Sequence, residues 1–111
     1  MTNLFHIKSK YADDDVFIEA GRYHDGTMAI RLVLDTGQPV LVPTVCLSHL
    51  NIKPAEGNVF IKNWSENEGI LESLQESGIL GESVAQHKTG FATADECKLL
   101  IPLDDSRVRL I

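Results

Sequence analysis

The sequence predicts an α+β domain: a largely antiparallel β-sheet with meander connections, and one principal α-helix (about Glu66–Ser77) packed on one of its faces. Two observations carry this prediction. Residues 28–35 alternate between two sets of side chains with the two-residue period of a strand. The segment after Trp64 instead places apolar residues at helical spacing, between a serine that can cap a helix and a glycine that can end one.

The meander is predicted to contain three strands, at residues 16–23, 28–34 and 39–47. Asp25-Gly26 supplies a hairpin turn between the first two strands, and Asp35-Thr36-Gly37-Gln38 a turn before the third. Because Pro43 cannot donate a ladder hydrogen bond, the third strand is expected at an edge or interrupted there. An open edge near Val40–Leu47 would let two copies pair, so we expect a monomer or a weak homodimer.

The start of the chain, Leu4–Lys8, is predicted to add a further strand. A solvated polar turn at Asp13-Asp14-Asp15 would separate it from the meander. At 111 residues the chain is long enough for one hydrophobic core and too short for two, so residues 1–111 are expected to form a single domain.

The helix start is predicted from Ser65 and Glu68, which have the spacing of a capping box. The helix end is predicted from Gly78, the expected left-handed residue, with Ile79 folding back onto Leu74. Gly69 is unfavourable in a first helical turn. We expect it to leave room for the Trp64 ring or for a closely approaching strand; the alternative is a bound ligand or partner backbone.

The C-terminal third has weaker signals. Residues 82–90 are expected to form a loop. Short strands at 91–93 and 97–101 are expected on either side of a turn or bulge at Ala94-Asp95-Glu96. The tail from Pro102 is mostly polar and is expected to fray.

Composition and charge argue against a membrane protein, a secreted protein and a nucleic-acid-binding protein. No run approaches the length of a membrane span and the N-terminus lacks a signal-peptide core, so a cytoplasmic protein without membrane contact is expected. Cys46 and Cys97 are expected to be buried thiols. A net charge of −6 argues against direct nucleic-acid binding. Between Lys62 and Lys88 the chain carries acids but no basic residue, which indicates either a solvated helix face or a surface for a basic partner; these acids are Glu66, Glu68, Glu72, Glu76 and Glu82.

We find no catalytic or metal-binding pattern. The four histidines lack ligand partners at metal-site spacing, and the Asp13-Asp14-Asp15 run lacks the alternation of a calcium loop. Ser48-His49 is adjacent only in sequence, without a nucleophile elbow. We therefore expect a non-enzymatic protein with no cofactor and no metal.

The best candidate site is the corner around Trp64, the only tryptophan. Its ring is expected to pack on the helix start, but a partly exposed ring would suit a partner-binding hot spot. The same corner could hold a small anion on free helix amides.

A series of motifs runs along the chain: Asp35-Thr36-Gly37-Gln38-Pro39, then Val59 to Gly69 (VFIKNWSENEG), Leu71 and Leu74, Gly78-Ile79-Leu80, Gly90-Phe91, and Cys97-Lys98-Leu99. Together they resemble the DUF4313 family, small bacterial proteins of unknown function that tend to lie on conjugative elements and phages. The likeness covers about residues 16–101, and its specific part is Ile61–Gly69. It implies no activity or catalytic residue. It does imply an accessory protein of a mobile element.

Two functions are compatible with these observations. The preferred one is a small acidic interaction protein that modulates a protein partner, with a surface formed by Trp64, Glu68, Glu72 and Glu76. The alternative is a regulatory domain that binds a small ligand or anion at the Trp64–Gly69 corner, through Asn63, Trp64, Ser65 and Asn67.

Overall fold

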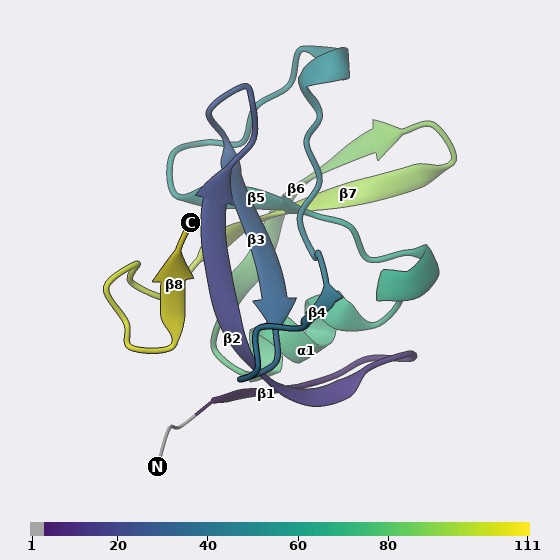
Figure 1. The fold of residues 1–111 in the computed structure, drawn as a ribbon. Helices are drawn as coiled ribbons and strands as arrows, with labels where there is room; N and C mark the ends of the chain where they lie inside the picture. The colour runs from purple at the N-terminus through teal and green to yellow at the C-terminus, as the bar shows by residue number, and fades with distance from the viewer. Residues whose placement is uncertain (1–3) are drawn as a thin grey trace.

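The computed structural model describes residues 4–111 and confirms the predicted class, a largely antiparallel β fold with one principal α-helix (Figure 1). No helix among these residues has the length and apolar character needed to cross a membrane. In chain order the elements are β1 (Phe5–Lys8), β2 (Asp13–Arg22), β3 (Met28–Val33), β4 (Pro39–Leu41), β5 (Asn58–Ile61), α1 (Ile70–Glu76), β6 (Leu80–Thr89), β7 (Ala92–Leu99) and β8 (Val108–Leu110).

The first sheet has the order β1-β2-β3-β4 and contains the predicted meander. β2 is long enough to pair with β1 through its first residues and with β3 through the rest. The hairpin turn at Asp25-Gly26 forms as predicted, closed by a hydrogen bond from the Tyr23 amide to the Thr27 carbonyl oxygen at 2.8 Å. The predicted strand at Leu4–Lys8 corresponds to β1.

The second sheet has the order β5-β7-β6. A single bridge between Thr44 and Ile61 joins it to the segment after β4. β6 and β7 form a long hairpin whose tip projects away from the rest of the molecule (Figure 1). The main core lies where α1 and the two sheets meet, and its fully buried side chains include Ile7, Ile18, Leu32, Ile61, Ile70 and Leu74.

Four expectations about the strands are wrong. Residues 82–89 belong to β6 and not to a loop, and Ala94-Asp95-Glu96 lies in the middle of β7 and not in a turn or bulge. Asp13-Asp14-Asp15 begins β2, where Asp13 and Asp15 contact His6 of β1. The tail from Pro102 ends in β8, which pairs in parallel with β2.

Cation–π contacts from two arginines hold the β8 segment against β1 and β2, which the polar sequence of the tail did not predict. The guanidinium groups of Arg107 and Arg109 stack on the rings of Phe5 and Phe17, 3.9 and 4.1 Å from the ring centroids. Such cation–π contacts are worth about 0.5–1 kcal/mol each at exposed sites. Arginines therefore cover two core aromatic rings while their charges remain near water.

The predicted third strand is interrupted at Pro43, which is one of the two outcomes predicted for it. β4 ends at Leu41, and the chain then pairs with β5: the Val45 amide donates to Phe60 O (3.1 Å) and the Lys62 amide to Pro43 O (2.7 Å). These bonds occupy part of the edge that was expected to be open near Val40–Leu47.

The α-helix starts later than predicted and without a capping box. Ser65–Asn67 forms a separate 3₁₀ turn, and α1 begins at Ile70 after Gly69, whose φ is 90°. The Ser65 and Glu68 side chains make no cap hydrogen bond; instead Asn63 Oδ1 accepts from the Leu71 amide at 2.9 Å.

The end of α1 forms as predicted. Gly78 has a φ of 80°, the Ile79 amide donates to Leu74 O (2.9 Å) and the Gly78 amide to Gln75 O (3.1 Å). This pair of bonds is a Schellman motif. Ile79 and Leu74 are both buried, as the hydrophobic contact of that motif requires.

Candidate functional site

The Trp64 corner is mainly a packing site. Trp64 is partly buried against the smaller of two core clusters, which consists of Leu47, Phe60 and Ala94 with Val45 and Ile52 beside them. Only part of the ring is therefore left for a partner.

The polar groups expected to bind an anion at this corner are engaged within the protein. Asn63 caps α1 through its Oδ1. Asn67 is fully buried, and its Nδ2 donates to Val42 O at 2.7 Å. The remaining polar atom of Asn67, Oδ1, is an acceptor and has the wrong polarity for an anion. Ser65 is exposed, with a left-handed backbone (φ 54°).

Gly69 lies where the chain after β1 crosses the start of α1. A Cβ at this position would meet the Lys10 amide nitrogen at 3.4 Å and the Ser9 Cα at 3.5 Å. The segment beside Gly69 is not a strand, these distances are ordinary van der Waals contacts, and the Trp64 ring is not among the nearest atoms, so neither expected reason for this glycine is needed. The reason for glycine is the positive φ, which the sequence did not reveal.

The acidic residues divide into paired and unpaired groups. Glu66 pairs with Lys62 at 2.7 Å, and Glu68 with Lys10 at 2.8 Å. Glu72 and Glu76 are exposed, one helical turn apart on α1, and form no ion pair among residues 4–111. Of the four residues expected to bind a partner, the fold thus places Glu72 and Glu76 together. Glu68 lies outside the helix.

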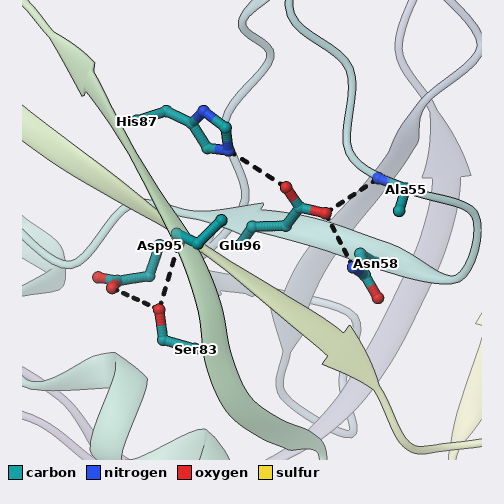
Figure 2. A network of polar contacts seen from close by, with 7 residues as sticks. Ala55, Asn58, Ser83, His87, Asp95 and Glu96 are labelled. Atoms are coloured by element: carbon teal, nitrogen blue, oxygen red, sulfur yellow. Dashed lines mark hydrogen bonds and ion pairs between the residues drawn. The ribbon is translucent and has the colours of Figure 1, made fainter.

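Two buried carboxylates lie in β7, and the sequence did not predict them (Figure 2). Glu96 Oε2 accepts from the Ala55 amide (2.9 Å) and from Asn58 Nδ2 (2.8 Å), and its Oε1 lies 3.1 Å from His87 Nε2. Burial raises the pKa of Glu96, but the hydrogen bonds from Asn58, Ala55 and His87 together lower that pKa below its ordinary value.

Asp95 points to the opposite face of the hairpin from Glu96, because neighbouring residues of a strand alternate. Its Oδ1 accepts from Ser83 Oγ at 2.8 Å and from Gln86 Nε2 at 3.0 Å. Both carboxylates therefore brace the hairpin. Glu96 also anchors the loop before β5, which indicates a structural role more than a catalytic one.

The loop before β5 forms one wall of a cleft of about 520 Å³, and the β2–β3 turn forms the opposite wall. Its charged lining residues are two cations, Arg22 and Lys53, and two acids, Asp25 and Glu56. Opposite charges in equal number do not select an anion or a cation.

The only nucleophile beside a histidine ring in the described chain is Ser48, whose Oγ lies 3.2 Å from His24 Nε2 and not against His49. No carboxylate of residues 4–111 hydrogen-bonds to His24, so the orienting member of a catalytic triad is missing there. Burial raises the pKa of Cys97 to about 11, which leaves this thiol unreactive. Within the same residues no three His, Cys, Asp or Glu side chains converge as a metal site.

Comparison with family models, with curated proteins and with solved structures finds no match for this chain. The resemblance to DUF4313 therefore stays a prediction.

Proposed function

We propose that this protein is a small non-enzymatic interaction protein that binds a basic surface of a protein partner through Glu72 and Glu76 of α1, with the exposed part of Trp64 at the margin. The setting we propose is the cytoplasm. From the resemblance to DUF4313, the partner that we propose is a protein of the mobile element or of its host.

The observation that carries this proposal is the position of Glu76. It is the last residue of α1, where the negative end of the helix dipole disfavours a carboxylate, and the last turn contains no basic residue. Glu72, four residues earlier, adds a like-charge pair that costs about 0.2–0.5 kcal/mol. Acids that weaken their own helix are better explained by binding than by folding.

The helix is also held firmly enough to present these acids in a fixed geometry. Asn63 caps its first turn, and Ser73 Oγ accepts from the Lys8 amide at 2.7 Å. Near its end, Gln75 Nε2 donates to Gly81 O at 3.1 Å. Preorganisation of this kind reduces the entropy lost on binding.

The test is affinity capture from nuclease-treated bacterial lysate, read by mass spectrometry. The native chain is compared with Glu72→Lys/Glu76→Lys and with Asp35→Lys/Asp104→Lys. The second variant makes the same change in net charge at exposed acids that are not part of α1. A partner captured at stoichiometric amounts by the native chain and the control, but lost from the α1 variant, is the expected result.

Equal capture by all three proteins would contradict the assignment of the surface, and capture by none would contradict the function. In the second case the ligand-binding alternative at Asn63, Trp64, Ser65 and Asn67 has its own readout. A small anion bound there would change Trp64 fluorescence, and the α1 variant would respond like the native chain.

A further inference from the structure

We infer that the cleft between the β2–β3 turn and the loop before β5 binds a small zwitterion with an apolar side chain, such as a free amino acid or a short peptide. Each wall carries one cation and one acid: Arg22 and Asp25 on the turn, Lys53 and Glu56 on the loop. Charges of both signs do not select a simple ion. They do complement a ligand that carries an ammonium group and a carboxylate group together.

The fold leaves the four charged side chains of the cleft unpaired. None of them forms an ion pair within the described part of the chain, although the two walls carry opposite charges. Hydrogen bonds from Thr27 lower the pKa of Asp25, and the charge of Lys53 adds to that effect, so Asp25 is ionised at neutral pH. These charges are therefore free to bind a ligand.

The Asp25 carboxylate also has an acceptor that the protein does not use fully. Its Oδ1 accepts from the Thr27 amide at 3.0 Å and from the Thr27 hydroxyl at 2.6 Å. Its Oδ2 is shielded from water and makes no hydrogen bond of normal geometry within residues 4–111. Besides Thr27, the only donor that acts on this carboxylate is the Cys46 thiol, and a thiol is a weak donor. An ammonium group that enters beside Asp25 would supply a stronger donor.

Both walls are held in place by the protein itself. In the turn, Arg22 Nη1 donates to Gly26 O at 2.9 Å. In the loop, the Ala55 amide and Asn58 Nδ2 both donate to Glu96 Oε2 of β7. A site whose walls are fixed before binding loses little conformational entropy when a ligand enters. The buried Glu96 therefore supports one wall of the proposed site.

Apolar side chains beside these charges indicate the rest of the ligand. The apolar residues that line the cleft include Met28, Val59, Leu99 and Leu103. A neighbouring hollow of about 530 Å³ shares Arg22, Met28 and Leu103 with the cleft, and its other lining residues are Ala20, Gly21, Leu110 and Ile111. Among the described side chains that line this hollow, only Arg22 is charged. A ligand held by its charged groups in the cleft can therefore place an apolar side chain in the hollow, where burial favours it.

A titration followed by the amide chemical shifts of the ¹⁵N-labelled chain tests this inference. The two probes are L-leucine and L-leucyl-L-leucine. Three reduced probes each lack one feature: N-acetyl-L-leucine lacks the ammonium group, L-leucinamide lacks the carboxylate, and glycine lacks the apolar side chain. We expect at least one of the two full probes to shift the amides of Thr27, Ala55 and Gly57 saturably, with a Kd of about 1 mM or lower. The tighter of the two identifies the ligand as an amino acid or a peptide, and the reduced probes should bind at least about tenfold more weakly.

Four variants test the assignment of the charges. Asp25→Asn and Lys53→Gln each remove one charge from a wall and should weaken binding of the tighter probe by about tenfold. Asp25→Asn keeps an oxygen that can accept from Thr27, and in this variant the advantage of L-leucine over N-acetyl-L-leucine should shrink. Asp35→Asn and Lys88→Gln are the matched controls at exposed positions outside the cleft lining, and they should bind within about threefold of the native chain. Circular dichroism of each variant verifies the fold.

The absence of a saturable shift at these amides with either full probe, up to about 20 mM, would overturn the inference. Equal binding of N-acetyl-L-leucine or L-leucinamide would overturn it as well. So would cleft variants that bind like the native chain, or controls that weaken binding as much as the cleft variants do. Because Glu72 and Glu76 are unchanged in all these proteins, the outcome is separate from that of the proposed partner binding.

Discussion

At the scale of single residues, the position of α1 is set by contacts from outside the helix. Asn63, which lies seven residues before the first residue of α1, caps the helix, and the Lys10 amide donates to Glu68 O at 3.0 Å just before Gly69. Gly69 must then turn the chain into the helix with a positive φ, in contact with Ser9 and Lys10.

Gly69→Ala should lower the free energy of unfolding by about 1–2 kcal/mol, because an L-residue is strained in this conformation. Urea denaturation measures the loss. Gly78→Ala is the matched control: it has a similar φ, but an added Cβ meets no atom within 4 Å. Any excess loss at Gly69 then reports the crossing chain, and no loss at Gly69 would contradict the left-handed conformation.

Glu96 should contribute stability that disappears in acid. Its pKa is lower in the folded protein than the ordinary 4.5, so the contribution is complete above about pH 4.5 and is lost as the pH falls through the lowered pKa. The comparison is with Glu96→Gln, which cannot ionise. The difference in unfolding free energy between the two proteins should be constant at neutral pH and shrink in acid; a difference that grows in acid would contradict the hydrogen-bond network.

The two ends of α1 show which features can be predicted from the sequence and which cannot. Gly78, Ile79 and Leu74 were predicted correctly because a Schellman motif depends only on neighbours in the chain. Ser65 and Glu68 satisfy a capping-box spacing equally well, yet Glu68 pairs with Lys10, a residue that is distant in sequence. Local spacing could not reveal that competing partner.

At the scale of elements, the hydrophobic pattern predicted the strands that contribute one face to the core and missed the β6–β7 hairpin. β3 alternates clearly because one face is buried. Most of β6 is exposed and polar as an edge strand, so it resembles a loop in sequence. Asp95 and Glu96 indicated a turn because buried acids are rare, and only their partners in distant segments make their burial possible.

Glu76→Lys should stabilise the protein while it removes partner binding. The lysine would suit the negative end of the α1 dipole and would form a favourable pair with Glu72, which together should add about 0.5–1 kcal/mol to the free energy of unfolding. Glu76→Gln, which only removes the charge, should give a smaller gain. A loss of stability in both variants would show that Glu76 supports the fold, and would remove the main argument for its role in binding.

At the scale of the whole molecule, the fold assigns two proposed binding regions to different elements. The acids of α1 face a proposed basic partner, and the cleft between the β2–β3 turn and the loop before β5 holds a proposed zwitterionic ligand. The buried carboxylates of β7 brace the β6–β7 hairpin, and Glu96 also holds the loop before β5. The net charge of −6 attracts a basic partner and should raise the rate of association. Because salt screens this attraction, the association rate should fall as the salt concentration rises.

The proposal that α1 carries the partner-binding surface is tested most directly by affinity. Isothermal titration calorimetry measures how tightly the captured partner binds three purified proteins. These are the native chain, Glu72→Lys/Glu76→Lys and Asp35→Lys/Asp104→Lys. We predict that the α1 variant binds at least about tenfold more weakly, a loss of about 1.4 kcal/mol, while the control binds within about threefold of the native chain. Equal weakening of both variants would mean that only net charge matters, and unchanged binding of the α1 variant would contradict the account.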